Sequence, residues 1–114
     1  MDSTRKHLRF NCQGSADLTD GANGRCWGHL GDISLGGFYV STFGPWPINT
    51  EVRFKIEAEG KEICGVGVIA TSHPGVGMAV VINELSPDHK ERLTQVIDSL
   101  EGTGDGAAGI GLRV

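Results

Sequence analysis

One short segment constrains the fold more than any other part of the chain. Between Glu51 and Glu57, the apolar residues Val52, Phe54 and Ile56 alternate with charged ones. A strand directs successive side chains to opposite faces, so this run predicts a β-strand with one buried face and one face in water. Eighteen glycines in 114 residues, about twice ordinary usage, indicate a chain rich in turns. The sequence therefore predicts a mainly β protein.

Turn signals divide the rest of the chain into further short apolar runs. We expect strands over residues 10–18, 25–30, 37–41, 63–70 and 76–82. Glycines alternate with apolar residues in the last two runs. This pattern favours strong bending or close backbone approach, as in a small barrel.

The end of the chain predicts a helix followed by a tail. Ser86 suits the N-cap, and Pro87 suits the first helical position. An apolar stripe with helical spacing follows, formed by Leu93, Val96, Ile97 and Leu100. We expect Gly102 to end the helix and residues 102–114 to be disordered. Barrel and helix together predict one domain over residues 10–101.

Charge is distributed unevenly along the chain. Residues 1–10 carry three Lys or Arg and one Asp, a net charge of +2, whereas the other 104 residues carry seven Lys or Arg and 13 Asp or Glu, a net charge of −6. Nonspecific nucleic-acid binding depends on neutralising phosphates, so the acidic body argues against a nucleic-acid partner. A basic arm on an acidic body suits a small anion instead.

The expected compartment, and with it the expected state of the cysteines, follows from segments that the sequence lacks. The chain has neither an apolar run long enough to span a membrane nor the apolar stretch of a secretory signal, so we expect a cytoplasmic protein. In that compartment, Cys12, Cys26 and Cys64 are expected to be free thiols or small buried hydrophobes.

The first motif with a chemical meaning is a pair of arginines, Arg5 and Arg9, in an arm over residues 1–9 that we expect to be flexible. A guanidinium donates paired hydrogen bonds to phosphate oxygens or to guanine O6 and N7, and it stacks on purines. Two of them could hold both the charge and the bases of a dinucleotide. A solvated basic arm explains this motif equally well when it is taken alone.

The second motif is a turn with the pattern Asp32-x-Ser34-x-x-Gly37, and it follows Arg9 by 23 residues. The Asp32 carboxylate can accept two parallel hydrogen bonds from the N1–H and N2–H edge of guanine, and Ser34 can add a donor or acceptor there. Gly36 and Gly37 allow positive φ, so the backbone can bend sharply and a base can lie against it. In the alternative interpretation, Asp32 and Ser34 satisfy only their own backbone.

In this order, the two motifs resemble those of the PilZ domain family, receptors for the bacterial second messenger cyclic di-GMP. The resemblance extends from about Arg5 to Leu100 and includes the apolar segment 37–40, the element at 75–78 and the terminal helix. It implies a small six-stranded antiparallel β-barrel with a C-terminal α-helix.

The resemblance also implies a ligand and a role for each motif. Arg5 and Arg9 would contact the phosphates and the faces or O6/N7 edges of the bases of cyclic di-GMP. Asp32 and Ser34 would contact the Watson–Crick side of guanine, beside the glycines of the turn. We expect the arm to become ordered on binding and to signal to an unidentified downstream protein. A ligand-independent protein-interaction adaptor on the same fold is the alternative.

Other chemistry is poorly supported by the sequence. Four histidines invite a metal site, but only Cys26 and His29 stand near ligand spacing, and no second pair accompanies them. Nucleophile motifs and paired acidic residues are lacking, so we expect no enzyme activity, no metal and no cofactor beyond the nucleotide ligand.

Overall fold

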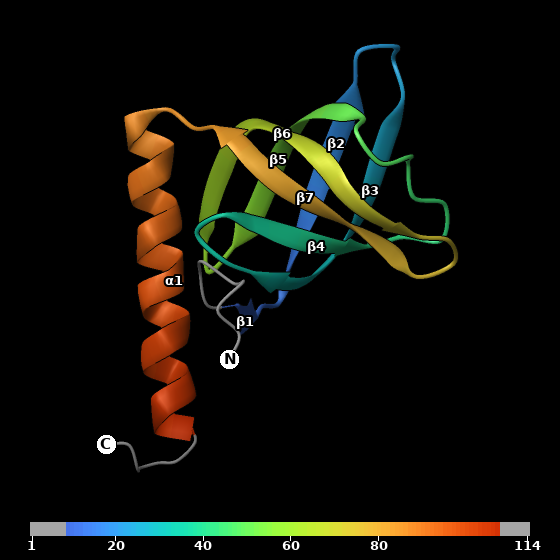
Figure 1. Ribbon diagram of the computed structural model, residues 1–114. Helices are drawn as coiled ribbons and strands as arrows, with labels where there is room; N and C mark the ends of the chain where they lie inside the picture. The colour runs from blue at the N-terminus through green and yellow to red at the C-terminus, as the bar shows by residue number, and fades with distance from the viewer. Residues whose placement is uncertain (1–8, 108–114) are drawn as a thin grey trace.

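The computed structural model describes residues 9–107, with side chains as far as residue 101. Its elements are β1 (Phe10–Asn11), β2 (Gly14–Asp20), β3 (Arg25–Ile33), β4 (Gly37–Ser41), β5 (Glu51–Ala58), β6 (Lys61–His73), β7 (Gly77–Glu84) and α1 (Pro87–Ala107). The predicted mainly β class with a C-terminal helix is confirmed (Figure 1).

Strands β2 to β7 form a closed six-stranded antiparallel barrel. Their order is β3-β2-β5-β6-β7-β4, and pairing between β3 and β4 closes the ring. The short strand β1 is additional and pairs with the end of β3, where Asn11 lies opposite Asp32. The barrel thus brings the start of the described chain to the strand that carries the aspartate of the second motif.

The alternation in β5 produces the expected burial. Val52, Phe54 and Ile56 are buried inside the barrel, whereas the residues between them are exposed. Phe54 meets Phe38 of β4 edge to face, with ring centroids 5.0 Å apart. These side chains, which come from strands on different sides of the barrel, fill its interior.

The chain from residue 10 to residue 18 is not one strand, contrary to the prediction. Asn11 pairs with Asp32 and Ser15 with His29, so the chain contains one more residue here than a continuous ladder would need. The extra residue interrupts pairing at Cys12 and Gln13, and it separates β1 from β2.

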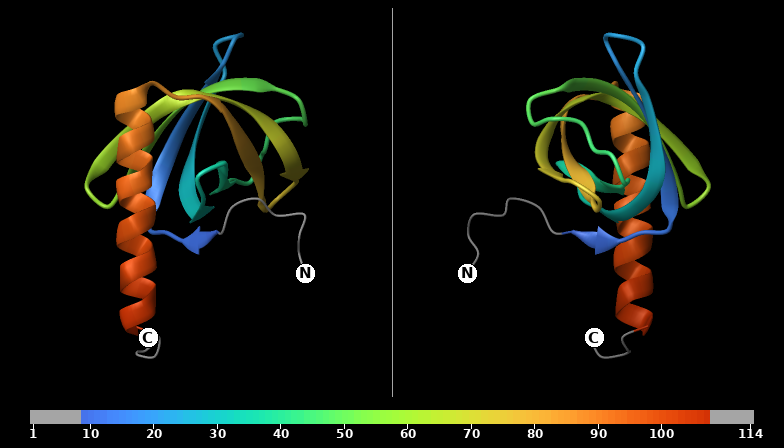
Figure 2. Two further views of the ribbon diagram at one scale, coloured as in Figure 1. Left: turned by 60° about the vertical axis from the view of Figure 1, so that its left-hand side comes forward. Right: turned by 90° about the vertical axis from the view of Figure 1, so that its right-hand side faces the viewer.

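Helix α1 stands beside the barrel and extends past it (Figures 1 and 2). Leu93, Val96 and Ile97 of the predicted stripe are buried, and Leu100 packs against the same core. The amide of His89 lies 3.4 Å from the Ser86 hydroxyl, which confirms the predicted N-cap.

Two polar contacts attach the helix to β6. The Cys64 amide donates a hydrogen bond to Nδ1 of His89 at 2.9 Å, and Arg92 donates one to the Glu62 carbonyl at 3.1 Å. The first of these contacts requires the unprotonated nitrogen of the imidazole to face the barrel.

The helix continues past Gly102 to Ala107, so its expected end at Gly102 is wrong. A glycine weakens a helix by about 1 kcal/mol relative to alanine but does not by itself end it. The rest of the expected disordered tail, residues 108–114, lies outside the described residues. Within residues 9–107, no helix combines the length and the apolar character needed to cross a membrane.

Candidate functional site

The second motif forms the tight connection between β3 and β4. The Ser34 amide donates a hydrogen bond to the Gly37 carbonyl at 2.8 Å, which closes the turn. The Ile82 amide of β7 donates to the Gly36 carbonyl at 2.9 Å. The turn is therefore fixed both internally and to the neighbouring strand.

The Ser34 side chain is committed to this turn. It is only 7% exposed, and its hydroxyl oxygen lies 3.2 Å from the Gly36 amide, the Gly37 amide and the Gly37 carbonyl. A hydroxyl offers one donor and two acceptor positions, so these three contacts use its full capacity. For Ser34, the alternative interpretation of the motif, a side chain that satisfies its own backbone, describes the observed contacts.

Asp32 behaves differently. Its Oδ2 lies 3.9 Å from Nη1 of Arg9, and their side chains are 27% and 42% exposed. Its Oδ1 is buried, and it has no hydrogen-bond partner among the residues that the structure describes. Buried polar atoms normally have a partner, so this oxygen is unsatisfied within the described residues.

The glycines of the turn have ordinary backbone conformations. Neither Gly36 nor Gly37 has positive φ; among the described glycines, Gly60 and Gly75 do. Gly37 is required for space instead, because a Cβ there would collide with the Val80 carbonyl oxygen on β7. The turn thus does not use the positive φ that its glycines allow, and close packing of β4 on β7 explains Gly37.

The structure brings together Arg9 and the turn, while Arg5 lies outside the described residues. It also places Tyr39 of β4, which belongs to neither motif, beside Asp32 as its direct partner in the strand register. The sequence contained a signal for this neighbour, because a tight turn after Asp32 pairs the residues that flank it. The bulge between Leu30 and Asp32 makes the register uncertain from sequence alone.

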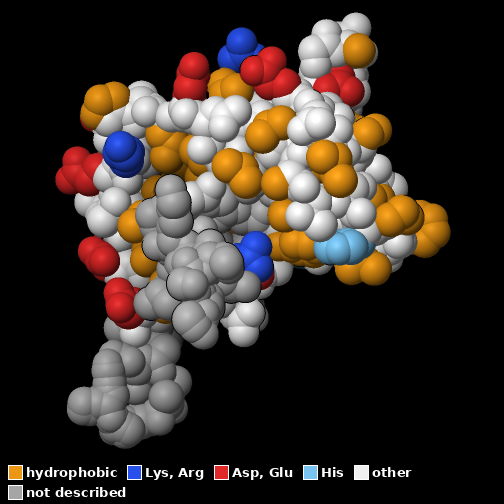
Figure 3. All heavy atoms as spheres, in the orientation of Figure 1, with side chains coloured by type: hydrophobic (Ala, Val, Ile, Leu, Met, Phe, Trp, Pro, Cys, Tyr) orange, Lys and Arg blue, Asp and Glu red, His pale blue; other side chains and the backbone are white. Residues whose placement is uncertain are grey.

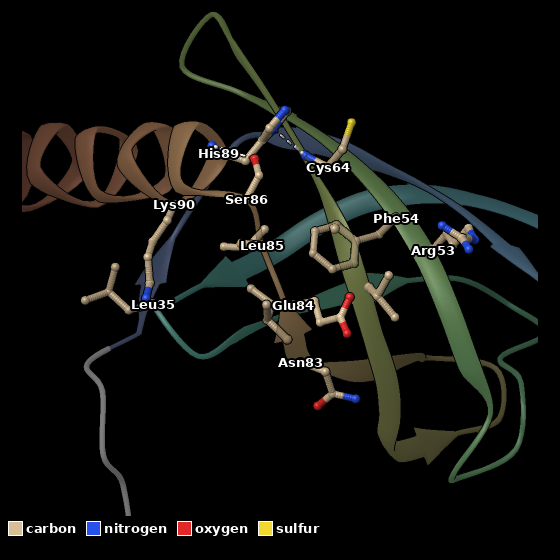
Figure 4. Close-up of a pocket in the computed structure, with 13 residues that line it drawn as sticks. Leu35, Arg53, Phe54, Cys64, Asn83, Glu84, Leu85, Ser86, His89 and Lys90 are labelled. Atoms are coloured by element: carbon tan, nitrogen blue, oxygen red, sulfur yellow. Dashed lines mark hydrogen bonds between the residues drawn. The ribbon is translucent and has the colours of Figure 1, made fainter.

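An open cavity of about 1000 Å³ begins at Leu35 of the turn and extends between α1 and strands β5 to β7 (Figure 4). Phe54, Glu84, His89 and Lys90 are among its lining residues, and Figure 4 shows Lys90 reaching from α1 toward Leu35. Its lining includes neither Arg9 nor Asp32. The cavity therefore adjoins the turn without containing the charged pair.

All three cysteines are free thiols, as predicted, and none belongs to the turn. Burial raises the pKa of the Cys12 thiol, and the negative charge of Glu59 raises it further. Burial also raises the pKa of Cys64, with an additional contribution from Glu62. Raised values keep these thiols protonated at neutral pH and disfavour a nucleophilic role.

The fold and the turn define the class of protein, a small antiparallel barrel with a C-terminal helix and a charged pair beside one strand connection. Residues 3–99 match the family model for the PilZ domain, and this chain belongs to that family. No curated protein is significantly similar to it in sequence.

Solved structures with the same fold are distant in sequence. The PilZ domain of YcgR from Escherichia coli, solved with c-di-GMP, has a TM-score of 0.69 and 16% identity over 88% of this chain and 93% of its own. The inhibitor of motility MotI/DgrA from Bacillus subtilis has a TM-score of 0.71 and 13% identity over 87% of this chain and 52% of its own. The PilZ domain of CeSA from a cellulose-synthesizing bacterium has a TM-score of 0.63 and 18% identity over 82% of this chain and 98% of its own.

Proposed function

We propose that this chain is a cyclic di-GMP receptor domain and not an enzyme. The observation that carries the proposal is the Asp32 carboxylate, which has one buried oxygen without a donor among the described residues and the other facing Arg9. Family membership and the cyclic di-GMP bound to the PilZ domain of YcgR support the choice of ligand.

The chemistry of guanine matches this carboxylate. Guanine presents N1–H and N2–H side by side, and two such donors can bond to the two oxygens of Asp32. Binding would supply the partner that Oδ1 lacks and would release Arg9 for the ligand phosphates or the O6/N7 edge. Arg5 would provide a second cation from the arm. Ser34 acts in this proposal by holding the turn that positions Asp32.

Binding and the expected discrimination are tested together by calorimetric titration with three nucleotides. We expect cyclic di-GMP to bind and GTP not to bind. Cyclic di-AMP is the matched control, because it has the same cyclic phosphate backbone but its adenine lacks the N1–H donor. Equal affinity for the two cyclic dinucleotides would contradict the role of Asp32, and no binding by cyclic di-GMP would contradict the proposed function.

Variants assign the roles within the site. We expect Arg9→Ala and Asp32→Ala each to weaken cyclic di-GMP binding by at least tenfold, because each removes a charged hydrogen-bonding group. Asp17→Ala is the matched control, since Asp17 forms an exposed pair with Arg25 at 3.0 Å away from the turn. It should bind as the unmodified chain does.

Signal output would come from ordering of the arm over residues 1–9, which a downstream protein would recognise. Hydrogen exchange with and without saturating ligand tests this step. Slower amide exchange in this segment is expected. If the chain binds the ligand but exchange is unchanged, arm ordering is wrong and the receptor function remains.

A second function, protein docking independent of the nucleotide, is favoured by one surface. At the end of the barrel, Phe43 is 88% exposed and Val76 is 60% exposed, and two backbone hydrogen bonds join their loops. Exposed neighbouring apolar side chains are typical of interaction surfaces. If Arg9→Ala captures the same proteins as the unmodified chain and nucleotide has no effect, this second function replaces the first.

A further inference from the structure

Tyr39 lies beside the carboxylate to which the proposed function assigns guanine. Asp32 of β3 and Tyr39 of β4 are direct partners across the antiparallel pair, so their side chains leave the same face of the sheet about 5 Å apart at Cβ. The flanking residues Phe38 and Val40 are buried in the barrel. Tyr39 therefore projects outward, next to the site.

The Tyr39 ring lies close to glycines of the neighbouring strands. A Cβ at Gly77 of β7 would collide with the Val40 carbonyl oxygen, and it would also lie 2.6 Å from Cε2 and 3.0 Å from Cζ of Tyr39. Glycine at this position therefore leaves room both for close packing of β4 on β7 and for the Tyr39 ring. On the other side, a Cβ at Gly31 would contact Cδ2 at 3.4 Å, and Ala79 is the partner of Tyr39 on β7. Small residues thus surround the ring.

The outer end of the ring is also held. The Tyr39 hydroxyl lies 3.1 Å from Nδ1 of His73, within hydrogen-bond distance, and the two ring centroids are 6.2 Å apart with planes inclined by 33°. A hydrogen bond to the hydroxyl limits rotation of the ring. Tyr39 nevertheless remains partly exposed.

Apart from Asp32 and the Arg9 side chain that faces it, the strand segments around Tyr39 carry no charge. Residues 33–50 and 63–83, which include β4 and most of β6 and β7, contain no Asp, Glu, Lys or Arg. In Figure 3 the one histidine in view is surrounded mainly by apolar and neutral atoms. A neutral aromatic ring beside a carboxylate suits a flat heterocycle with hydrogen-bond donors on one edge.

We propose that Tyr39 is the stacking surface for the guanine whose edge Asp32 binds, and that Gly77 and His73 position its ring. This inference rests on the proposed cyclic di-GMP function and assigns it a further contact residue. Base–aromatic stacking is commonly worth a loss of roughly 10- to 100-fold in affinity when the ring is removed. Asp32 would then select the base, and Tyr39 would add affinity.

The test compares four variants by calorimetry with cyclic di-GMP. Tyr39→Leu keeps an apolar side chain but removes the aromatic ring, and we expect at least tenfold weaker binding. Tyr39→Phe and Tyr39→Trp keep a ring and should bind within about threefold of the unmodified chain. His73→Ala should weaken binding less than Tyr39→Leu, because it loosens the ring without removing it.

A spectroscopic measurement separates stacking from a purely structural role. Tyr39 is the only tyrosine of the chain, so selective tyrosine labelling gives the signals of a single ring. We expect its ring-proton resonances to move upfield when guanine stacks on it. Thermal unfolding of each variant identifies any loss of binding that comes from loss of folding, and rescue by Tyr39→Phe excludes that explanation.

Binding by the unmodified chain distinguishes a failure of the stacking proposal from a failure of the receptor function. If the unmodified chain binds cyclic di-GMP while Tyr39→Leu binds equally well or the ring resonances do not move, stacking is wrong and the receptor function remains. If the unmodified chain does not bind, the receptor function is wrong and stacking is overturned with it.

Discussion

Arg9 and Asp32 face each other across 3.9 Å, so two motifs that are 23 residues apart in the chain meet on one side of the barrel. Both side chains are partly exposed, and such pairs stabilise a fold by at most about 1 kcal/mol. The contact is therefore weak enough to be exchanged for a ligand. Its arrangement matters for binding more than for stability.

We expect Asp32→Ala to leave stability almost unchanged. The substitution removes a weak ion pair, but it also removes a buried oxygen that has no partner within the described chain, and these two effects oppose each other. Urea denaturation should give a free energy of unfolding within about 1 kcal/mol of the unmodified value. A loss of several kcal/mol would show that Asp32 supports the fold.

Ser34→Ala, in contrast to Asp32→Ala, should lower the free energy of unfolding. It removes the three hydrogen bonds that the hydroxyl makes inside the turn and leaves buried backbone groups without it, which should cost about 1–3 kcal/mol. Ser41→Ala is the matched control, because Ser41 is exposed at the end of β4. Equal urea midpoints for the two variants would contradict the structural role of Ser34.

Gly37→Ala should destabilise the barrel by roughly 2 kcal/mol or more, because its new Cβ would force β4 away from β7. The control is Gly44→Ala, where a Cβ would have no neighbour within 4 Å. Thermal unfolding should separate the two alanine variants clearly. If both melt at the same temperature, the strands tolerate a side chain at Gly37.

Leu93→Ala should lower the free energy of unfolding by about 2–4 kcal/mol, since the leucine is 1% exposed where α1 meets the barrel. Glu91→Ala, on the exposed side of the same helix, serves as the control and should change little. A similar small effect from both variants would mean that the helix is not part of the cooperative unit.

Cys12 should react with iodoacetamide only at a higher pH in the native chain than in the urea-unfolded chain. The folded state raises the pKa of this thiol, so its reactive thiolate forms later as pH increases. The unfolded state then binds fewer protons above the ordinary thiol pKa, and stability falls as pH rises through that range. Mass spectrometry of labelled peptides measures the two profiles, and identical profiles would contradict the shift.

Local patterns predicted most of the architecture. The alternation around Phe54 identified a strand and its buried face, and Ser86 identified the start of the helix, because each signal depends on neighbours in the chain. The break at Cys12 and Gln13 was not predictable, since it arises from the register that β1 and β2 each adopt on β3. The helix end predicted at Gly102 is wrong for a different reason, because a glycine permits a helix end without requiring one.

The candidate site was predicted as a set of residues but not as a set of roles. The motif predicts the same role for Asp32 and Ser34, contact with guanine. In the folded turn, however, the Ser34 hydroxyl bonds to the backbone, whereas one Asp32 oxygen has no partner among the described residues. The position of Tyr39 beside Asp32 depends on the cross-strand register, which the bulge after Leu30 shifts. The contribution of Gly37 depends on Val80, which is 43 residues away in the chain and adjacent in the barrel.

The packing of Gly37 against β7 has a consequence for how such motifs change over evolutionary time. A descendant that lost all contact with nucleotides would still be under selection to keep the serine and this glycine, because its barrel would need them to close. Its aspartate and its arginines would be free to drift. In a newly sequenced relative, the serine and glycine would therefore identify the architecture, whereas the aspartate and arginines would indicate whether the signal is still received.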